Sequence, residues 1–156
     1  YDLWSRWQSE SPDDILLAHA SIHGNTARAA ELFKQKLEAK GARVTLCDLT
    51  TTEVSYAVAN AFYCGKLVLA CSTYDGGLFP PMEEFLSHLQ AKGFRSRTVG
   101  LIENGSWAPC AAKKMHTLLD TMKDLTVLEQ TVTIRSAVKP GDESALLALA
   151  DAVHQA

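Results

Sequence analysis

The chain has 156 residues, of which 47% are hydrophobic, and a formal net charge of -3. This length suits one domain with a sizeable core and leaves no room for a second independent domain. The weak negative charge, the lack of a basic cluster and the lack of a long apolar run argue against nucleic-acid binding, membrane-surface binding and a membrane span.

The first dozen residues differ in composition from the rest. Tyr1, Trp4 and Trp7 would place aromatic side chains along one side of a short helix, which the following Ser-Pro-Asp-Asp would end. We interpret residues 1–12 as a linker or the tail of an upstream domain, and residues 13–156 as one folded domain. A tag remnant or a packed N-terminal helix remains the alternative interpretation.

From Ile15 onwards, five predicted strands alternate with five predicted helices. Apolar runs without polar alternation predict strands that are covered on both faces, and alternating runs predict edge strands. The covered strands are Ile15–Ala20, Leu67–Cys71 and Val99–Ile102, and the edge strands are Arg43–Cys47 and Thr131–Ile134.

Apolar residues spaced three or four apart predict a helix in each connection and at the end of the chain. Gly41 and Gly93 follow the first and third helices, and Pro80-Pro81 stands where a helix start tolerates proline. Pro140–Glu143 is a predicted turn before the last helix. The apolar sets are Ala30/Phe33/Leu37, Val54/Ala57/Ala61, Met82/Phe85/Leu86/Leu89, Ala111/Met115/Leu118/Met122 and Leu146/Leu149/Val153.

This alternation predicts an α/β fold, a doubly wound five-stranded parallel sheet with helices on both faces. With the second and fifth strands at the edges, the simplest strand order is 2-1-3-4-5. That order creates a topological switch point between the first and third strands. We therefore expect the turns after the first, third and fourth strands to share one edge of the sheet and to bind a ligand.

The turn after the first strand, Ser21 to Thr26, contains hydroxyl and amide side chains, a glycine and a histidine, His23. No Lys or Arg lies between Ile15 and Ala27, and neither a Walker loop nor a dinucleotide fingerprint is present. The turn predicts a phosphate site formed by hydroxyls, backbone N–H groups and the N-terminus of a helix. An ordinary helix cap is the alternative.

The other two turns carry glycines, polar side chains and one aromatic residue each. Tyr74 and Trp107 are candidates to pack against the flat ring system of a flavin, whose polar edge needs backbone and amide hydrogen bonds. Taken singly, both are also compatible with aromatic residues that cover loop ends, and the glycines with simple turns. The candidate residues are Ser72, Thr73, Tyr74, Asp75, Gly76, Gly77, Asn104, Gly105, Ser106 and Trp107.

Three segments together resemble the flavodoxin-like domain of flavodiiron proteins: His23–Thr26, Ser72–Glu83 and Ile102–Pro109. The resemblance runs from about Ile15 to the C-terminus. It implies a flavodoxin-like fold that binds FMN, with Ser21, His23, Gly24, Asn25 and Thr26 at the phosphate. It also implies that Thr73–Gly77 and Asn104–Trp107 surround the ring.

The resemblance further implies an electron-transfer function. FMN would receive electrons from rubredoxin or a flavin/rubredoxin reductase and pass them to a diiron centre that reduces dioxygen or nitric oxide. The His/Asp/Glu ligands of that centre are absent from this chain, so its own chemistry would be electron transfer, with no catalytic residue and no metal site. The parent protein would be a head-to-tail homodimer, whereas this fragment by itself could be a monomer.

Other functions remain open at this point. They are a free-standing flavodoxin that carries electrons, an FMN-dependent NAD(P)H:quinone reductase, and a flavodoxin-like binding module without a cofactor. The weak net charge and the linker-like N-terminus disfavour the free carrier.

Four cysteines lie in or beside apolar runs without C-x-x-C spacing, and five scattered histidines form no metal motif. We interpret Cys47, Cys64, Cys71 and Cys110 as reduced residues of a cytoplasmic protein.

Overall fold

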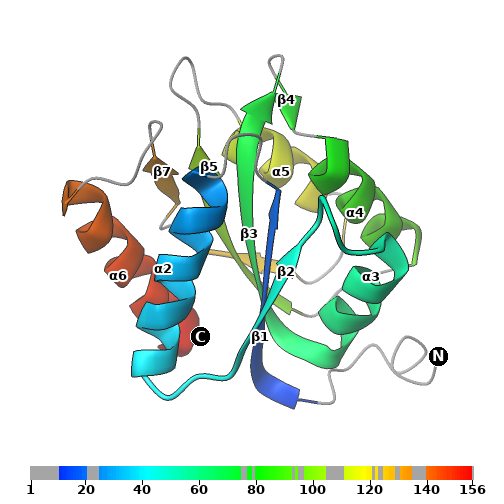
Figure 1. The fold of residues 1–156 in the computed structure, drawn as a ribbon. Coiled ribbons are helices and arrows are strands. Elements are labelled where there is room, and N and C mark those ends of the chain that lie inside the picture. The colour runs from blue at the N-terminus through cyan, green and yellow to red at the C-terminus, as the bar shows by residue number, and fades with distance from the viewer. Residues whose placement is uncertain are drawn as a thin grey trace.

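The computed structural model describes residues 11–20, 25–74, 77–78, 80–92, 94, 97–104, 111–120, 122, 125–128, 131–134 and 140–155. A central, mainly parallel sheet is covered by helices on both faces (Figure 1). Helices α2 (Asn25–Ala39) and α6 (Pro140–Gln155) lie on one face. Helices α3 (Val54–Tyr63), α4 (Pro80–Ala91) and α5 (Ala111–Leu119) lie on the other. The predicted N-terminal helix lies outside the described residues.

The strand order confirms the predicted topology. Neighbouring strands follow the order β2-β1-β3-β5-β6, so the parallel positions read 2-1-3-4-5. The strands are β1 (Ser11–Ala20), β2 (Val44–Asp48), β3 (Cys64–Tyr74), β4 (Gly77–Leu78), β5 (Arg97–Asn104), β6 (Leu125–Val127) and β7 (Val132–Ile134).

Two short strands share the fifth position of the sheet. β6 pairs with the beginning of β5, at Arg97 to Val99, and β7 pairs with its end, at Ile102 to Asn104. The sequence analysis predicted β7 and missed β6, although both are three residues long and both alternate apolar, polar and apolar residues. Together, β6 and β7 pair with the two ends of the longer strand β5.

Three strands, β1, β3 and β5, are longer than predicted, and β5 extends two residues beyond its predicted range at each end. β1 begins at Ser11, which pairs with Cys64, and its register shifts before Ile15. β3 continues to Tyr74 and pairs there with β4 in an antiparallel hairpin. Polar residues at strand ends carry no apolar signal, so the sequence pattern detected only the buried middle of each strand.

The helix ends agree with the predicted signals, with one correction. Gly41 follows α2 with a φ of 87°, a conformation that favours glycine, and Pro80 begins α4. The Pro-Gly-Asp-Glu segment that was expected to precede the last helix is instead its first turn. Proline tolerates that position, and Asp142 and Glu143 interact favourably with the positive end of the helix dipole.

Alternate residues of the central strands enter two separate cores. On β1, Ile15 and Leu17 pack towards α2 and α6, whereas Leu16 and Ala18 pack towards α3, α4 and α5. This arrangement confirms the prediction that the apolar runs are strands covered on both faces.

Candidate functional site

The carboxyl ends of β1, β3 and β5 meet at one edge of the sheet. Ala20, the last residue of β1, pairs with Cys71 of β3, and the next residue of β3, Ser72, pairs with Asn104 at the end of β5. The three predicted turns therefore begin at adjacent points, as the strand order required. In Figure 1 these strand ends lie near the top of the view, beside the start of α2.

The first predicted turn connects the end of β1 to the start of α2. Asn25 and Thr26 are the first two residues of α2, and Thr26 is only 1% exposed. Ser21, His23 and Gly24 lie outside the described residues. The first turn of α2 contains no acidic residue, and Arg28 is exposed. The first turn of α2 therefore places no fixed negative charge at the positive end of the helix dipole, which suits an anion.

The second predicted turn is partly a hairpin. Thr73 pairs with Leu78 and Tyr74 with Gly77, so these residues belong to β3 and β4 and not to a loop. Asp75 and Gly76 lie outside the described residues. Asp-Gly is a preferred dipeptide for a two-residue hairpin connection, in line with the simple turn that the sequence analysis kept as an alternative for these glycines.

The third predicted turn begins at Asn104, the last residue of β5, which is buried. Gly105, Ser106 and Trp107 lie outside the described residues. The residue before Asn104 is Glu103, a buried carboxylate that accepts a hydrogen bond from Thr133 Oγ1 at 2.7 Å. The sequence interpretation did not select Glu103, although its position directly after an apolar strand was a usable signal.

His19, near the end of β1, is a second buried polar residue that the sequence analysis did not select. Its side chain is 4% exposed, and Nδ1 has no hydrogen-bond partner in the described part of the chain. Burial lowers the pKa of His19, against the opposing effects of Asp48 and Glu31. A histidine inside an apolar strand, just before the proposed phosphate turn, was the available signal.

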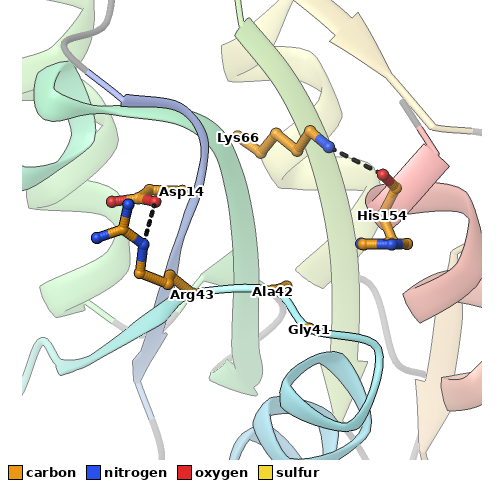
Figure 2. A pocket seen from close by; sticks show the side chains of 6 residues that line it. All are labelled: Asp14, Gly41, Ala42, Arg43, Lys66 and His154. Atoms are coloured by element: carbon orange, nitrogen blue, oxygen red, sulfur yellow. Dashed lines mark hydrogen bonds and ion pairs between the residues drawn. The ribbon is translucent and has the colours of Figure 1, made fainter.

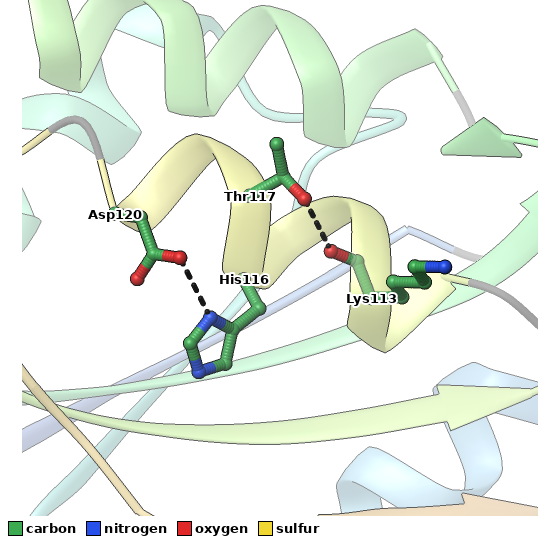
Figure 3. Close-up of polar contacts among 4 residues, drawn as sticks. All are labelled: Lys113, His116, Thr117 and Asp120. Carbon is green, nitrogen blue, oxygen red and sulfur yellow. Dashed lines mark hydrogen bonds and ion pairs between the residues drawn. The ribbon is translucent and has the colours of Figure 1, made fainter.

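Two other histidines lie on exposed helix surfaces. On α5, His116 Nδ1 lies 3.2 Å from Asp120 Oδ2, and Thr117 donates to the carbonyl of Lys113 (Figure 3). On α4, His88 Nε2 lies 3.9 Å from Glu84 Oε1. These one-turn pairs explain both side chains as ordinary helix-surface contacts.

The described cysteines behave as core residues. Cys47, Cys64 and Cys71 are buried thiols that form no disulfide, and Cys110 lies outside the described residues. Burial raises the pKa of Cys47, and raises that of Cys64 to about 11. Such thiols are poor nucleophiles at neutral pH, because the thiolate is the reactive form.

Metal-binding clusters and membrane-spanning helices are both absent from the described residues. No group of three or more His, Cys, Asp or Glu side chains in this part of the chain is placed to hold a metal ion. Among the same residues, no helix is long and apolar enough to cross a bilayer.

The described residues fit the chemistry of a flavin nucleotide. The start of α2 offers an amide residue, a buried hydroxyl residue and a helix N-terminus without a fixed negative charge. The end of β5 adds a buried amide side chain, Asn104, on the strand next to β3. Phosphate and the polar edge of a flavin ring both bind to donors of this kind.

Comparisons with known proteins agree with this architecture. No protein-family model matches the sequence. The putative diflavin flavoprotein A 2 of Thermosynechococcus vestitus is 25% identical over 108 residues, which are 69% of this chain and 19% of that protein.

Solved structures show the fold over nearly the whole chain. Rubredoxin oxygen:oxidoreductase from Desulfovibrio gigas matches 97% of this chain with a TM-score of 0.90 and 14% identity, over 37% of its own length. A mutant flavo di-iron protein from Thermotoga maritima matches 99% with a TM-score of 0.83 and 15% identity, over 38% of its length. An archaeal flavodoxin matches 91% with a TM-score of 0.78 and 17% identity, over 96% of its length.

The fold is therefore flavodoxin-like, and it matches the flavodoxin domain of flavodiiron proteins over nearly the whole chain. The chain spans 19% of the curated relative and less than two fifths of the two larger proteins of known structure.

Proposed function

We propose that this chain is an FMN-binding electron-transfer domain of a larger flavodiiron-type protein. The observation that carries the proposal is the meeting of three segments at one sheet edge: the start of α2 and the ends of β3 and β5. In a doubly wound sheet, ligands bind at this switch point. Bound FMN would supply the electron-transfer chemistry, and the chain would supply binding and orientation.

Each segment has a distinct role in the proposal. Ser21, His23, Gly24, Asn25 and Thr26 hold the phosphate through side-chain and backbone donors at the start of α2. Residues 72–77 and 104–107 surround the ring, with Tyr74 and Trp107 packed against it. Of these residues, Asn104 is buried, and it pairs with Ser72 of the neighbouring strand β3.

The larger context of the proposal rests on the relatives. The TM-score is higher for the domain of rubredoxin oxygen:oxidoreductase than for the archaeal flavodoxin, and the curated relative is also a much longer flavoprotein. We therefore propose rubredoxin or a related reductase as the electron donor, and a diiron domain of the parent protein as the acceptor. Residues 1–10, which precede β1, would then belong to the connection with that domain, in a cytoplasmic homodimer.

A free-standing flavodoxin is the second candidate. The archaeal flavodoxin is matched over 96% of its own length, so a domain of this size is a complete carrier in that protein. The two candidates share the cofactor and differ in the acceptor. Electron transfer from the reduced domain to a separately prepared diiron domain, compared with transfer to a soluble acceptor, would distinguish them.

The first experiment is a fluorescence titration of the purified apo-chain with FMN, with riboflavin in parallel. We expect saturable FMN binding and much weaker riboflavin binding, because riboflavin lacks the phosphate that the start of α2 would hold. Equal binding of both would contradict the phosphate assignment. Binding of neither would contradict the flavin proposal as a whole.

A variant tests the ring contact. Trp107→Ala should weaken FMN binding by about 1–2 kcal/mol through lost aromatic packing. The matched control is Tyr63→Ala, since Tyr63 is an exposed aromatic residue at the end of α3, next to the opposite edge of the sheet. An unchanged dissociation constant for Trp107→Ala would remove this residue from the site.

A further inference from the structure

Helix α3 presents an uncharged, aromatic surface to the solvent. Its ten residues contain no Asp, Glu, Lys or Arg, whereas α2, α4, α5 and α6 each contain several charged residues. Tyr56 is 62% exposed and Tyr63 is 41% exposed. The seven positions between them are about two helical turns, so both lie on one side of α3, with the exposed Ala59 between them. The residues that face the core are Ala57, Val58, Ala61 and Phe62.

The chain enters the described part of the domain next to this surface. Ser11, the first residue of β1, pairs with Cys64, which directly follows Tyr63 at the end of α3. Neighbouring strands lie about 4.8 Å apart, so Ser11 lies about one strand spacing from the end of this helix. Figure 1 shows the end of α3 near the bottom of the view, where β1 and β3 begin.

Residues 1–10, which precede Ser11, are long enough to lie along the whole of α3. A helix of ten residues is about 15 Å long. The ten preceding residues would span about 15 Å as a helix and about 33 Å when fully extended. Both segments run towards the pair of Ser11 and Cys64. A segment that lies along α3 would therefore place Trp7 nearer Tyr63 and Trp4 nearer Tyr56.

The composition of residues 1–10 suits this surface. Tyr1, Trp4 and Trp7 are the aromatic residues that the sequence spacing predicts on one side of a short helix. Aromatic pairs gain attraction beyond the apolar area that they bury, and a tyrosine at the edge of a contact keeps its hydroxyl in water. An uncharged helix face with two tyrosines can therefore be covered by indole rings without burying an ionised group.

The surface on the other face of the sheet is much less suitable, because it is charged. A pocket of about 260 Å³ lies there, between the turn that precedes β2 and the end of α6. In Figure 2, Arg43 Nε lies 3.4 Å from Asp14 Oδ1, and Lys66 Nζ donates to the main-chain carbonyl of His154 at 3.1 Å. Aromatic side chains packed over these groups would remove charges from water, which is costly.

We propose that residues 1–10 dock on α3 of the same molecule, with Trp7 against Tyr63 and Trp4 against Tyr56. The docked segment covers the aromatic surface and fixes the direction from which the chain reaches β1. The pair of Ser11 and Cys64 lies at the sheet edge opposite the proposed FMN site, so this docking does not depend on the cofactor.

Nuclear Overhauser contacts in the whole chain test the docking directly. We expect contacts from the indole protons of Trp7 to the ring of Tyr63, and from those of Trp4 to the ring of Tyr56. A mixture of isotope-labelled and unlabelled chains distinguishes contacts within one molecule from contacts between two. Absence of contacts between either indole and α3 would overturn the proposal. Contacts only between molecules would also overturn it, because a second copy would then cover α3.

Trypsin cleavage after Arg6, followed by mass spectrometry, gives a second measurement. The double variant Tyr56→Ser/Tyr63→Ser should be cleaved there about tenfold faster than the unaltered chain, because cleavage follows the population of the undocked segment. Both tyrosines are exposed, so the variant should fold. Leu147→Ser is the matched control, since Leu147 is an exposed apolar residue of α6, on the other face of the sheet. Equal rates in the unaltered chain and the double variant, or the same acceleration in Leu147→Ser, would contradict the docking.

Discussion

Among the described residues, His19 has a buried side-chain atom, Nδ1, that forms no hydrogen bond. It lies opposite Asp48 of β2 and Ala70 of β3, and its own carbonyl accepts the N–H of Leu49 at 2.8 Å. The carboxylate of Asp48 is engaged by Thr50, which donates to it from the backbone and from the side chain. The imidazole is therefore buried, and Nδ1 has no partner within the described part of the chain.

The lowered pKa of His19 makes the stability of the domain depend on pH. Because the folded state holds the proton less tightly than the unfolded state, protonation favours unfolding. The free energy of unfolding should be highest above the unfolded pKa, near 6.5, and should fall as the pH decreases below it. The contribution of one group cannot exceed about 1.4 kcal/mol per pH unit.

Urea unfolding at pH 7.5 and 5.5 measures this effect. His19→Leu should lose less stability between the two pH values than the unaltered protein does. His88→Ala, at an exposed histidine of α4, serves as the control and should behave like the unaltered protein. Equal losses in the unaltered protein and His19→Leu would show that His19 does not carry the pH dependence.

At the scale of elements, one buried arginine joins α3 to two strands. Arg97, at the start of β5, donates from Nε to the carbonyl of Cys64 and from Nη2 to that of Phe62, both at 3.0 Å. These carbonyls lie at the end of α3 and the beginning of β3, where a helix leaves acceptors without partners. The guanidinium also lies 5.5 Å from the ring centre of Phe94.

Arg97→Met should destabilise the domain by about 2–4 kcal/mol, because it leaves buried carbonyls without donors while keeping the side-chain length. Urea unfolding measures the loss. Arg43→Met is the matched control, since the side chain of Arg43 is largely exposed and its ion pair should contribute less than about 1 kcal/mol. Similar losses in both variants would contradict the capping role of Arg97.

At the scale of the whole molecule, the proposed FMN site depends on the complete sheet. The start of α2 and the ends of β3 and β5 are far apart in the sequence and meet only when β1, β3 and β5 pair. The two cores on the faces of the sheet hold these strands together. A ligand bound across their ends would therefore stabilise the folded state as a unit.

FMN at one hundred times its dissociation constant should raise the free energy of unfolding by about 2.7 kcal/mol. Riboflavin at the same concentration should raise it less. Urea unfolding followed by tryptophan fluorescence and by FMN release measures both quantities. A release of FMN well before the chain unfolds would show that the cofactor binds a local segment, contrary to the proposal.

The fold was largely predictable because its signals are local. Apolar runs marked the buried parts of β1, β3 and β5, and spaced apolar sets marked the helices. The hairpin of β3 with β4 was missed because its pairing depends on a neighbouring strand. β6 was overlooked, although it has the same apolar-polar-apolar pattern as β7.

The sequence by itself determined the doubly wound order and the sheet edge at which the three candidate turns begin, because the period of burial and the alternation of strands and helices follow from residue order. The ligand at that edge and the roles assigned to Ser21, His23, Tyr74 and Trp107 remain predictions. Only the tertiary structure decided that His19 is buried with no partner for Nδ1 among the described residues, and that Lys66 and Arg43 line one pocket. Such properties depend on contacts between distant segments, which no local pattern encodes.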